Sequence, residues 1–170
     1  NFSGLGTGGD AVQDDCQDGS GTNNANFGGS HTDGTSARVQ MYIFTGPTPD
    51  RDGSLDANVV YHEHTHGVSI RLVNGLTGQQ AGGMGEGWSD YFGLSLCSRN
   101  GMDPDAVYPA GSYASYQLNG TFNQNYYYGI RRFPYSTDLL KNPETYHTIA
   151  TATFTAGVPR STLISNTVGE

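Results

Sequence analysis

The stretch "VVYHEHTHGV", residues 59–68, places three histidines and a glutamate within the short run HEHTH. On an α-helix, residues i and i+4 lie on one face about one turn apart. His62 and His66 would therefore point to a common position, with Glu63 bordering the same face. Two imidazoles can hold zinc, and the neighbouring carboxylate can take a proton from water beside the metal. His64 lies about 200° around the helix from His62, so we expect it to be a surface or supporting histidine.

A catalytic zinc ion has three protein ligands and one open position, so a third ligand is required. The stretch "GEGWSD", residues 85–90, offers Glu86 and Asp90 one turn apart on a helical face. We predict Glu86 as the third ligand. We expect Asp90 to accept the N–H from the far nitrogen of a metal-bound histidine, which would fix its orientation. His31 and His147 are rival third ligands, but neither lies in a comparable pair of helices.

The helix that carries the histidine motif is predicted to run from about Ala57 to about Leu72. Asp56 is a suitable N-cap, with Ser54 as the alternative. The pair at positions 74–75, Asn-Gly, is typical of a helix end.

A second helix is predicted over residues 84–97, where apolar residues recur at helical spacing. Residues 37–44 alternate apolar and polar side chains, which indicates a strand. The segment "NNANF", residues 23–27, is a candidate edge segment, and a short helix is expected near 136–141. The sequence therefore predicts a loop-rich α+β fold. The apolar side of the second helix is expected to serve the core and consists of Trp88, Tyr91, Phe92 and Leu96.

The overall composition limits the kinds of partner. The chain has 170 residues, enough for one domain with a core. Eight Lys and Arg stand against 16 Asp and Glu, for a net charge of −8. A nucleic-acid partner is not expected, because phosphate binding needs a basic surface. No apolar run approaches the ~20 residues of a membrane span, so no membrane partner is expected either.

Two minor features bear on location and stability. Cys16 and Cys97 could form a disulfide, although two cysteines alone do not establish a pairing. Glycosylation sequons begin at Asn1 and Asn119, which favours a secreted protein.

The Asp-rich segment "PDRDGSLD" raises a calcium alternative through Asp50, Asp52 and Asp56. The distal glutamate of an EF-hand loop is missing from its spacing, so we favour a turn and a helix cap. Structural calcium alongside zinc stays open.

The two metal motifs together resemble those of a known family. "HEHTHGVS" followed by "GGMGEGWSDY" is similar to the fungalysins, secreted zinc endopeptidases distantly allied to thermolysin. "RVQMYIFTG", "RDGSLDANVVYHE" and "GIRRFPYSTDLLKNPETY" fit in order, so the likeness runs from about residue 10 to about residue 147. It implies a thermolysin-like zincin (gluzincin) core, zinc on His62, His66 and Glu86, and Glu63 as general base. It also implies cleavage of extracellular protein or peptide substrates, usually after removal of an inhibitory propeptide.

The resemblance suggests substrate-binding residues as well. "NNANF" is similar to the edge strand that pairs with an extended substrate in thermolysin-like enzymes, which makes Asn24 and Ala25 candidates. An Asn-rich turn is the alternative. Arg131 or Arg132 would bind a substrate carbonyl or support the fold.

Some features depart from the family pattern. His64 stands where the family usually has Tyr, and Asn166 falls where a histidine is expected. The family's catalytic domain is longer and continues into a helical C-terminal lobe, so we expect residues 1–170 to be a single but incomplete metallopeptidase catalytic domain. The alternative function is a non-catalytic zinc-binding or assembly module derived from such a half-domain.

Overall fold

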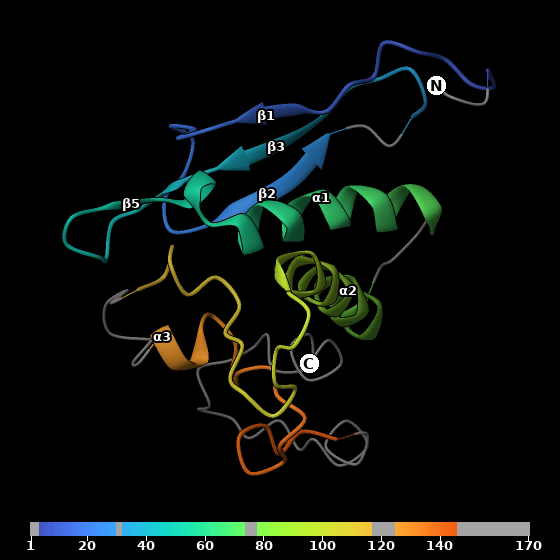
Figure 1. The fold of residues 1–170 in the computed structure, drawn as a ribbon. Coiled ribbons are helices and arrows are strands. Elements are labelled where there is room, and N and C mark those ends of the chain that lie inside the picture. Colours follow the sequence, from blue (N-terminus) through green and yellow to red (C-terminus); the bar gives the residue numbers. More distant parts are fainter. Residues whose placement is uncertain (1–3, 30–31, 74–77, 117–124, 146–170) are drawn as a thin grey trace.

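The computed structural model describes residues 4–29, 32–73, 78–116 and 125–145, in which helix α1 lies between a small sheet and helix α2 (Figure 1). Mixed helices and strands confirm the expected combination of α and β structure. In chain order the elements are β1 (Gln13–Asp15), β2 (Ala25–Gly29), β3 (Ala37–Met41), β4 (Ile43–Phe44), β5 (Arg51–Asp52), the 3₁₀ turn η1 (Gly53–Leu55), α1 (Ala57–Leu72), α2 (Gln79–Cys97) and α3 (Asn125–Tyr128).

The three-stranded sheet has the order β1-β3-β2, with β1 parallel and β2 antiparallel to β3. Its central strand follows the predicted period of two, because Ala37, Val39 and Met41 are buried. The predicted strand 37–44 is interrupted at Tyr42, whose N–H donates to Asn24 on one side while its carbonyl accepts from Gly53 on the other. The chain then leaves this sheet, and β4 pairs with β5 in a separate hairpin.

Helix α1 begins and ends at the predicted residues. The Asp56 side chain accepts from the N–H of Asn58 at 3.1 Å, which confirms it as the N-cap, whereas the alternative, Ser54, lies in η1. Close packing on both sides of α1 depends on glycine. A Cβ added at Gly67 would lie 2.4 Å from the Phe27 ring. A Cβ added at Gly93 of α2 would lie 3.0 Å from the backbone oxygen of Asn58.

Helix α2 starts five residues earlier than predicted, and its expected orientation is wrong. The glycines at its start hide the helical period in the sequence, because they carry no apolar side chain. The α1-facing side of α2 is small and polar, with Gly93, Ser89 and Asp90 buried. Small residues let the two helices approach closely, which leaves the large apolar residues outside. We call this exposed set the α2 outer side: Met84, Trp88, Tyr91, Phe92 and Leu96.

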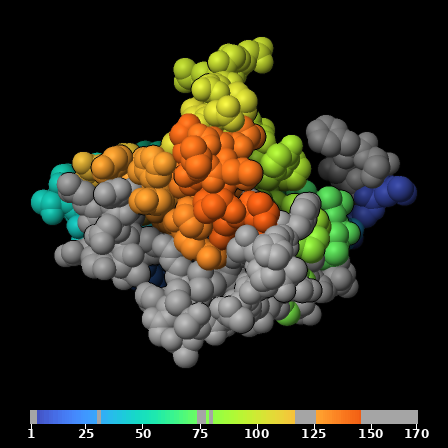
Figure 2. Space-filling view, turned by 90° about the horizontal axis from the view of Figure 1, so that it is seen from below, coloured from blue at the N-terminus to red at the C-terminus, as the bar shows by residue number. Residues whose placement is uncertain are grey.

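Segment 125–145 packs beside the segment that follows α2, as the orange-to-red and yellow surfaces show in Figure 2. Tyr108 and Tyr135 exchange two backbone hydrogen bonds of 3.0 Å. The predicted helix near 136–141 is wrong. Asp138 forms a turn there, accepting from Leu140 through its side chain and from Lys141 through its backbone carbonyl. Pro143 disfavours helical conformation at the residue before it.

The buried apolar core lies between the sheet, the start of α1 and the segment 110–116. The core residues are Ala25, Val39, Met41, Phe44, Val59 and Ala114.

Neither cysteine is paired: Cys16 and Cys97 are free and exposed. None of the described helices has both the length and the apolarity needed to cross a membrane. Seven residues singled out in the sequence lie outside the described residues: Asn1, His31, Asn74, Gly75, Asn119, His147 and Asn166.

Candidate metal centre

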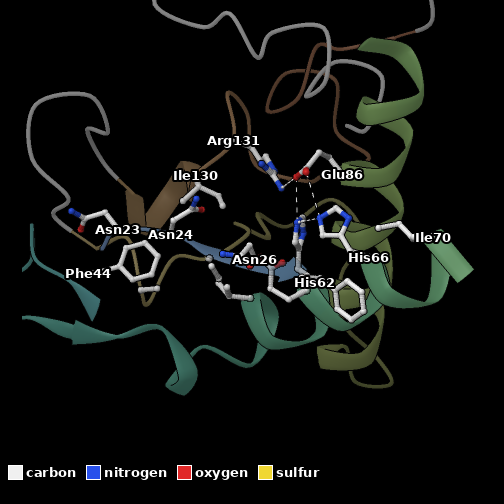
Figure 3. A pocket seen from close by; sticks show the side chains of 16 residues that line it. Asn23, Asn24, Asn26, Phe44, His62, His66, Ile70, Glu86, Ile130 and Arg131 are labelled. Carbon is white, nitrogen blue, oxygen red and sulfur yellow. Dashed lines mark hydrogen bonds and ion pairs between the residues drawn. The ribbon is translucent and has the colours of Figure 1, made fainter. Parts of the chain in front are cut away.

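Three side chains from two helices converge at one end of a pocket (Figure 3). His62 and His66 come from α1, and Glu86 comes from α2. The Nε2 atoms of the two histidines are 3.0 Å apart. Glu86 places Oε2 at 3.2 Å from the Nε2 of His62 and Oε1 at 3.4 Å from the Nε2 of His66.

These separations fit a metal ion with tetrahedral geometry. With ligand bonds of roughly 2.0–2.2 Å, neighbouring donor atoms in a tetrahedron lie about 3.3–3.6 Å apart. Two imidazole nitrogens and a carboxylate oxygen are also donors that zinc accepts. Within the described ranges, His62, His66 and Glu86 make up the one group of at least three such side chains close enough to share an ion.

We call the Nε2 atoms of His62 and His66 and the carboxylate of Glu86 the donor cluster. On the side of His62 opposite this cluster lies Asp90. Its Oδ1 lies 2.6 Å from Nδ1 of His62, and the residue is only 1% exposed. Since a carboxylate can only accept, Nδ1 carries the hydrogen, and Nε2 is the nitrogen that faces the cluster. Burial opposes the charged imidazole, but hydrogen bonds to Asp90 and Glu86 raise the pKa of His62 to about 9. A metal ion would therefore have to displace a proton from Nε2 to bind there.

Arg131 ties the two carboxylates of α2 together. Its guanidinium donates to both oxygens of Asp90, from Nε at 2.5 Å and from Nη2 at 2.9 Å. Nη2 also lies 3.3 Å from Oε2 of Glu86. Burial alone would raise the pKa of both carboxyls, but hydrogen bonds from His62 and the charge of Arg131 hold them below their ordinary values.

Arg131 and Arg132 are adjacent in sequence but have different surroundings in the structure. Arg131 lines the pocket, whereas Arg132 forms an ion pair of 2.9 Å with Glu144, whose side chain is buried. Arg132 therefore supports the fold. The position of Arg131 could not be predicted, because it comes from an irregular segment without a helical or strand period.

Glu63 lies beside the donor cluster and is 6% exposed. Burial raises the pKa of its carboxyl, and the negative charge of Glu86 acts in the same direction. The two histidines, when charged, and a backbone hydrogen bond from Phe27 act in the opposite direction. The net shift is upward, towards the range in which a carboxylate can exchange protons at neutral pH.

The pocket that contains these groups has a volume of about 660 Å³. Strand β2 forms one wall, where the predicted residues Asn24 and Ala25 both line the pocket. The apolar part of the wall could not be predicted from the sequence, because its members come from four separate segments. They are Phe44, Val59, Ile70, Gly111, Ala114 and Ile130.

Two side chains near the start of α1 hold the segment 110–116 against the pocket. Asp56 accepts from the N–H of Ala114 at 3.0 Å, and Asn58 accepts from the N–H of Gly111 at 2.9 Å. Asp56 therefore caps its own helix and anchors a second segment. Asp52 accepts from Ser54 at the start of η1. These contacts agree with the turn-and-cap interpretation of the Asp-rich segment, while structural calcium stays a prediction.

Strand β2 is an edge of the sheet, and its hydrogen-bonding pattern leaves Ala25 facing the pocket. Asn24 bonds to Tyr42 of the neighbouring chain segment through its carbonyl. In an antiparallel ladder, residues that bond to the partner strand alternate with residues that face the other way. The backbone groups of Ala25 and Phe27 therefore point away from β3, in agreement with the hydrogen bond from Phe27 to Glu63.

His64 points away from the donor cluster, as its position on the helix predicts. Its Nδ1 lies 2.9 Å from the carbonyl oxygen of Val60 in the preceding turn. Its Nε2 lies 3.3 Å from Asp14 of β1, and the side chain is half-exposed.

Comparison with known proteins shows the family of the chain. Residues 1–159 match the model of the fungalysin metallopeptidase family, M36, and the chain belongs to that family. It is 46% identical over 152 residues to a protein of Pyricularia oryzae named extracellular metalloproteinase MEP. It is 44% identical over 150 residues to extracellular metalloproteinase mep of Aspergillus fumigatus, and 43% identical over 152 residues to extracellular metalloproteinase 4 of Arthroderma gypseum.

These relatives are much longer than the present chain. The matches cover 86% of this chain but 22% of the Pyricularia protein, and 85% of this chain but 22% of the Aspergillus protein. For the Arthroderma protein the shares are 86% and 22%.

Proposed function

We propose that this chain carries the zinc-binding part of the active site of an extracellular endopeptidase. One observation carries the proposal: two imidazoles and a carboxylate converge from α1 and α2 beside the buried Glu63, in a pocket bordered by an edge strand. The names of the relatives support an extracellular location and protein or peptide substrates.

The proposed zinc ligands are His62, His66 and Glu86, whose donor separations and chemistry fit the ion. Zinc would supply Lewis acidity for water and for the peptide carbonyl. Asp90 keeps His62 in the tautomer that presents Nε2, since its carboxylate requires the hydrogen on Nδ1.

Glu63 is the proposed general base and acid. Its carboxylate would take a proton from the attacking water and deliver it to the leaving amine. Its burial, its upward-shifted pKa and its place in the pocket wall support this role.

Strand β2 is the proposed site for the substrate backbone. An extended peptide could add to its free edge through main-chain hydrogen bonds, which do not depend on side-chain identity. The outward-facing backbone of Ala25 would make these bonds, and the side chain of Asn24 would border the bound peptide.

We infer a thermolysin-like zincin arrangement in which residues 1–170 form one incomplete catalytic domain. The exposed α2 outer side supports this, because a set of large apolar side chains on one helix usually meets a partner surface. We propose that a further lobe of the longer protein covers it. The family resemblance also implies an inhibitory propeptide, and the Asp-rich segment 49–56 raises structural calcium; both stay predictions.

The experiment that tests the function is Glu63→Gln. The variant should retain zinc, because the three ligands are unchanged, but should lose at least about 100-fold of the rate of casein or quenched-peptide cleavage. Zinc content and cleavage are measured on the same preparation of a polypeptide extended to the length of the relatives, because residues 1–170 are proposed to form an incomplete domain.

His64→Gln is the matched control, since this neighbouring residue points away from the donor cluster. It should retain both zinc and cleavage. An active Glu63→Gln variant would disprove the role of Glu63. If the polypeptide extended to the length of the relatives binds zinc but cleaves neither substrate, a non-catalytic zinc-binding module is favoured instead.

A further inference from the structure

The Asp90 carboxylate has all of its acceptor positions occupied. Oδ1 accepts from Nδ1 of His62 and from Nη2 of Arg131, at 2.6 and 2.9 Å. Oδ2 accepts from Nε of Arg131 at 2.5 Å and from the hydroxyl of Tyr135 at 2.6 Å. A carboxylate offers about four such positions, so its orientation is fixed by three side chains.

Tyr135 belongs to this group without being one of the three proposed metal ligands. Its backbone is held by the paired hydrogen bonds with Tyr108, so the hydroxyl reaches Asp90 from a fixed position. Without this bond, Oδ2 would keep its contact with Nε of Arg131 but would lose the second donor that holds it.

We propose that Tyr135 is a positioning residue for the metal centre, acting on His62 through Asp90. By holding Oδ2, the Tyr135 hydroxyl keeps Oδ1 aimed at Nδ1 of His62. The imidazole is thereby held with Nε2 directed at the donor cluster. This inference rests on the proposed zinc site.

The geometry also explains why a hydroxyl is needed in addition to Arg131. The guanidinium is shared between Asp90 and Glu86, so a shift towards Glu86 would draw it away from Asp90. The Tyr135 hydroxyl donates to Asp90 from four positions further along the same segment, where the backbone is paired with Tyr108, so its bond does not depend on where the guanidinium lies.

The test compares Tyr135→Phe with Tyr108→Phe in the 170-residue chain. Each substitution removes one hydroxyl that donates a 2.6 Å hydrogen bond, to Asp90 in the first case and to the carbonyl of Asp103 in the second. Zinc affinity is measured by competition with a chromophoric chelator, and thermal unfolding of the metal-free chain is measured beside it.

Tyr135→Phe should weaken zinc binding about 10-fold or more, as found for partners that orient metal ligands. Tyr108→Phe should leave zinc affinity unchanged, and the two metal-free variants should unfold at similar temperatures. Equal zinc affinity in the two variants would overturn the inference. A wild-type chain that fails to bind zinc would instead overturn the proposed metal site.

A second background separates positioning from general damage to the fold. In Asp90→Asn the acceptor group is altered, so adding Tyr135→Phe should cost far less zinc affinity than it does in the wild type. If Tyr135→Phe costs the same zinc affinity with and without Asp90→Asn, then Tyr135 acts by another route, and the proposal is contradicted.

Discussion

The backbone conformation of Gly129 positions Arg131 beside the candidate metal centre. Gly129 has φ 63°, and a Cβ added there would lie 2.1 Å from the carbonyl oxygen of Ala110. That carbonyl accepts from the N–H of Ile130 at 3.0 Å, so this close approach fixes the start of the 130–131 segment.

Gly129→Ala should therefore destabilise the fold by at least about 1–3 kcal/mol, because a left-handed conformation is costly for alanine and the added carbon meets backbone. The free energy of unfolding is measured by denaturant titration. Gly82→Ala is the control: it lies within α2 with no atom within 4 Å of the added carbon. It should stabilise by up to about 1 kcal/mol. A neutral Gly129→Ala would contradict this account.

The site residues that could be predicted from the sequence are those whose spacing places them on one face of a helix. His62 and His66 are one helical turn apart, as are Glu86 and Asp90, so their relation follows from helix geometry. Arg131 follows no such period. Its contact with Asp90 spans 41 positions and depends on how an irregular segment packs.

Among the elements, strand β2 is both an edge strand of the sheet and a wall of the pocket. The N–H of Ala25 points away from β3, whereas the N–H of Asn26 points towards it, according to the alternation set by the Asn24–Tyr42 bond. Proline at these two neighbouring positions should therefore have different consequences.

Ala25→Pro places a larger ring in the core but keeps the ladder, so it should cost less stability than the loss of a ladder bond, while kcat/KM for a quenched peptide falls about 10-fold. Asn26→Pro, the control, removes a ladder bond and should lower the unfolding temperature. Both quantities are measured on each variant. Unchanged kcat/KM in Ala25→Pro would argue against strand addition at this edge.

The helices show where sequence reasoning succeeds and where it fails for elements. The bounds of α1 were predictable because Asp56 caps its start and Asn-Gly follows its end. For α2, the apolar period correctly indicated a helix but not its orientation. Glycine, Ser89 and Asp90 pack against α1 because close approach and hydrogen bonding outweigh side-chain hydrophobicity at that contact.

For the whole molecule, the α2 outer side is the surface at which the proposed further lobe can be tested. Phe92 is 49% exposed and Tyr91 is 64% exposed in the present chain. Replacing both with Gln should change the stability of this chain by less than about 1 kcal/mol, since exposed substitutions are usually mild.

In a polypeptide extended to the length of the relatives, the same double substitution should cost roughly 3–6 kcal/mol if a further lobe buries both side chains. Unfolding of the two lengths is compared under one condition, and the shorter chain serves as the control. An equal effect in both lengths would rule out a covering lobe at this surface.

The contacts of Asp90 with Arg131 and Tyr135 span 41 and 45 positions, which has a consequence for the order of assembly. Closing a long loop costs chain entropy, so contacts that are distant in sequence tend to form after local helices. The three proposed ligands have all been synthesised once residue 86 is added. The residues that hold Asp90, Arg131 and Tyr135, are synthesised later. During synthesis, the nascent chain would therefore pass through a stage in which the ligands are present but loosely held, and high-affinity metal capture would be delayed until residue 135 has emerged and docked.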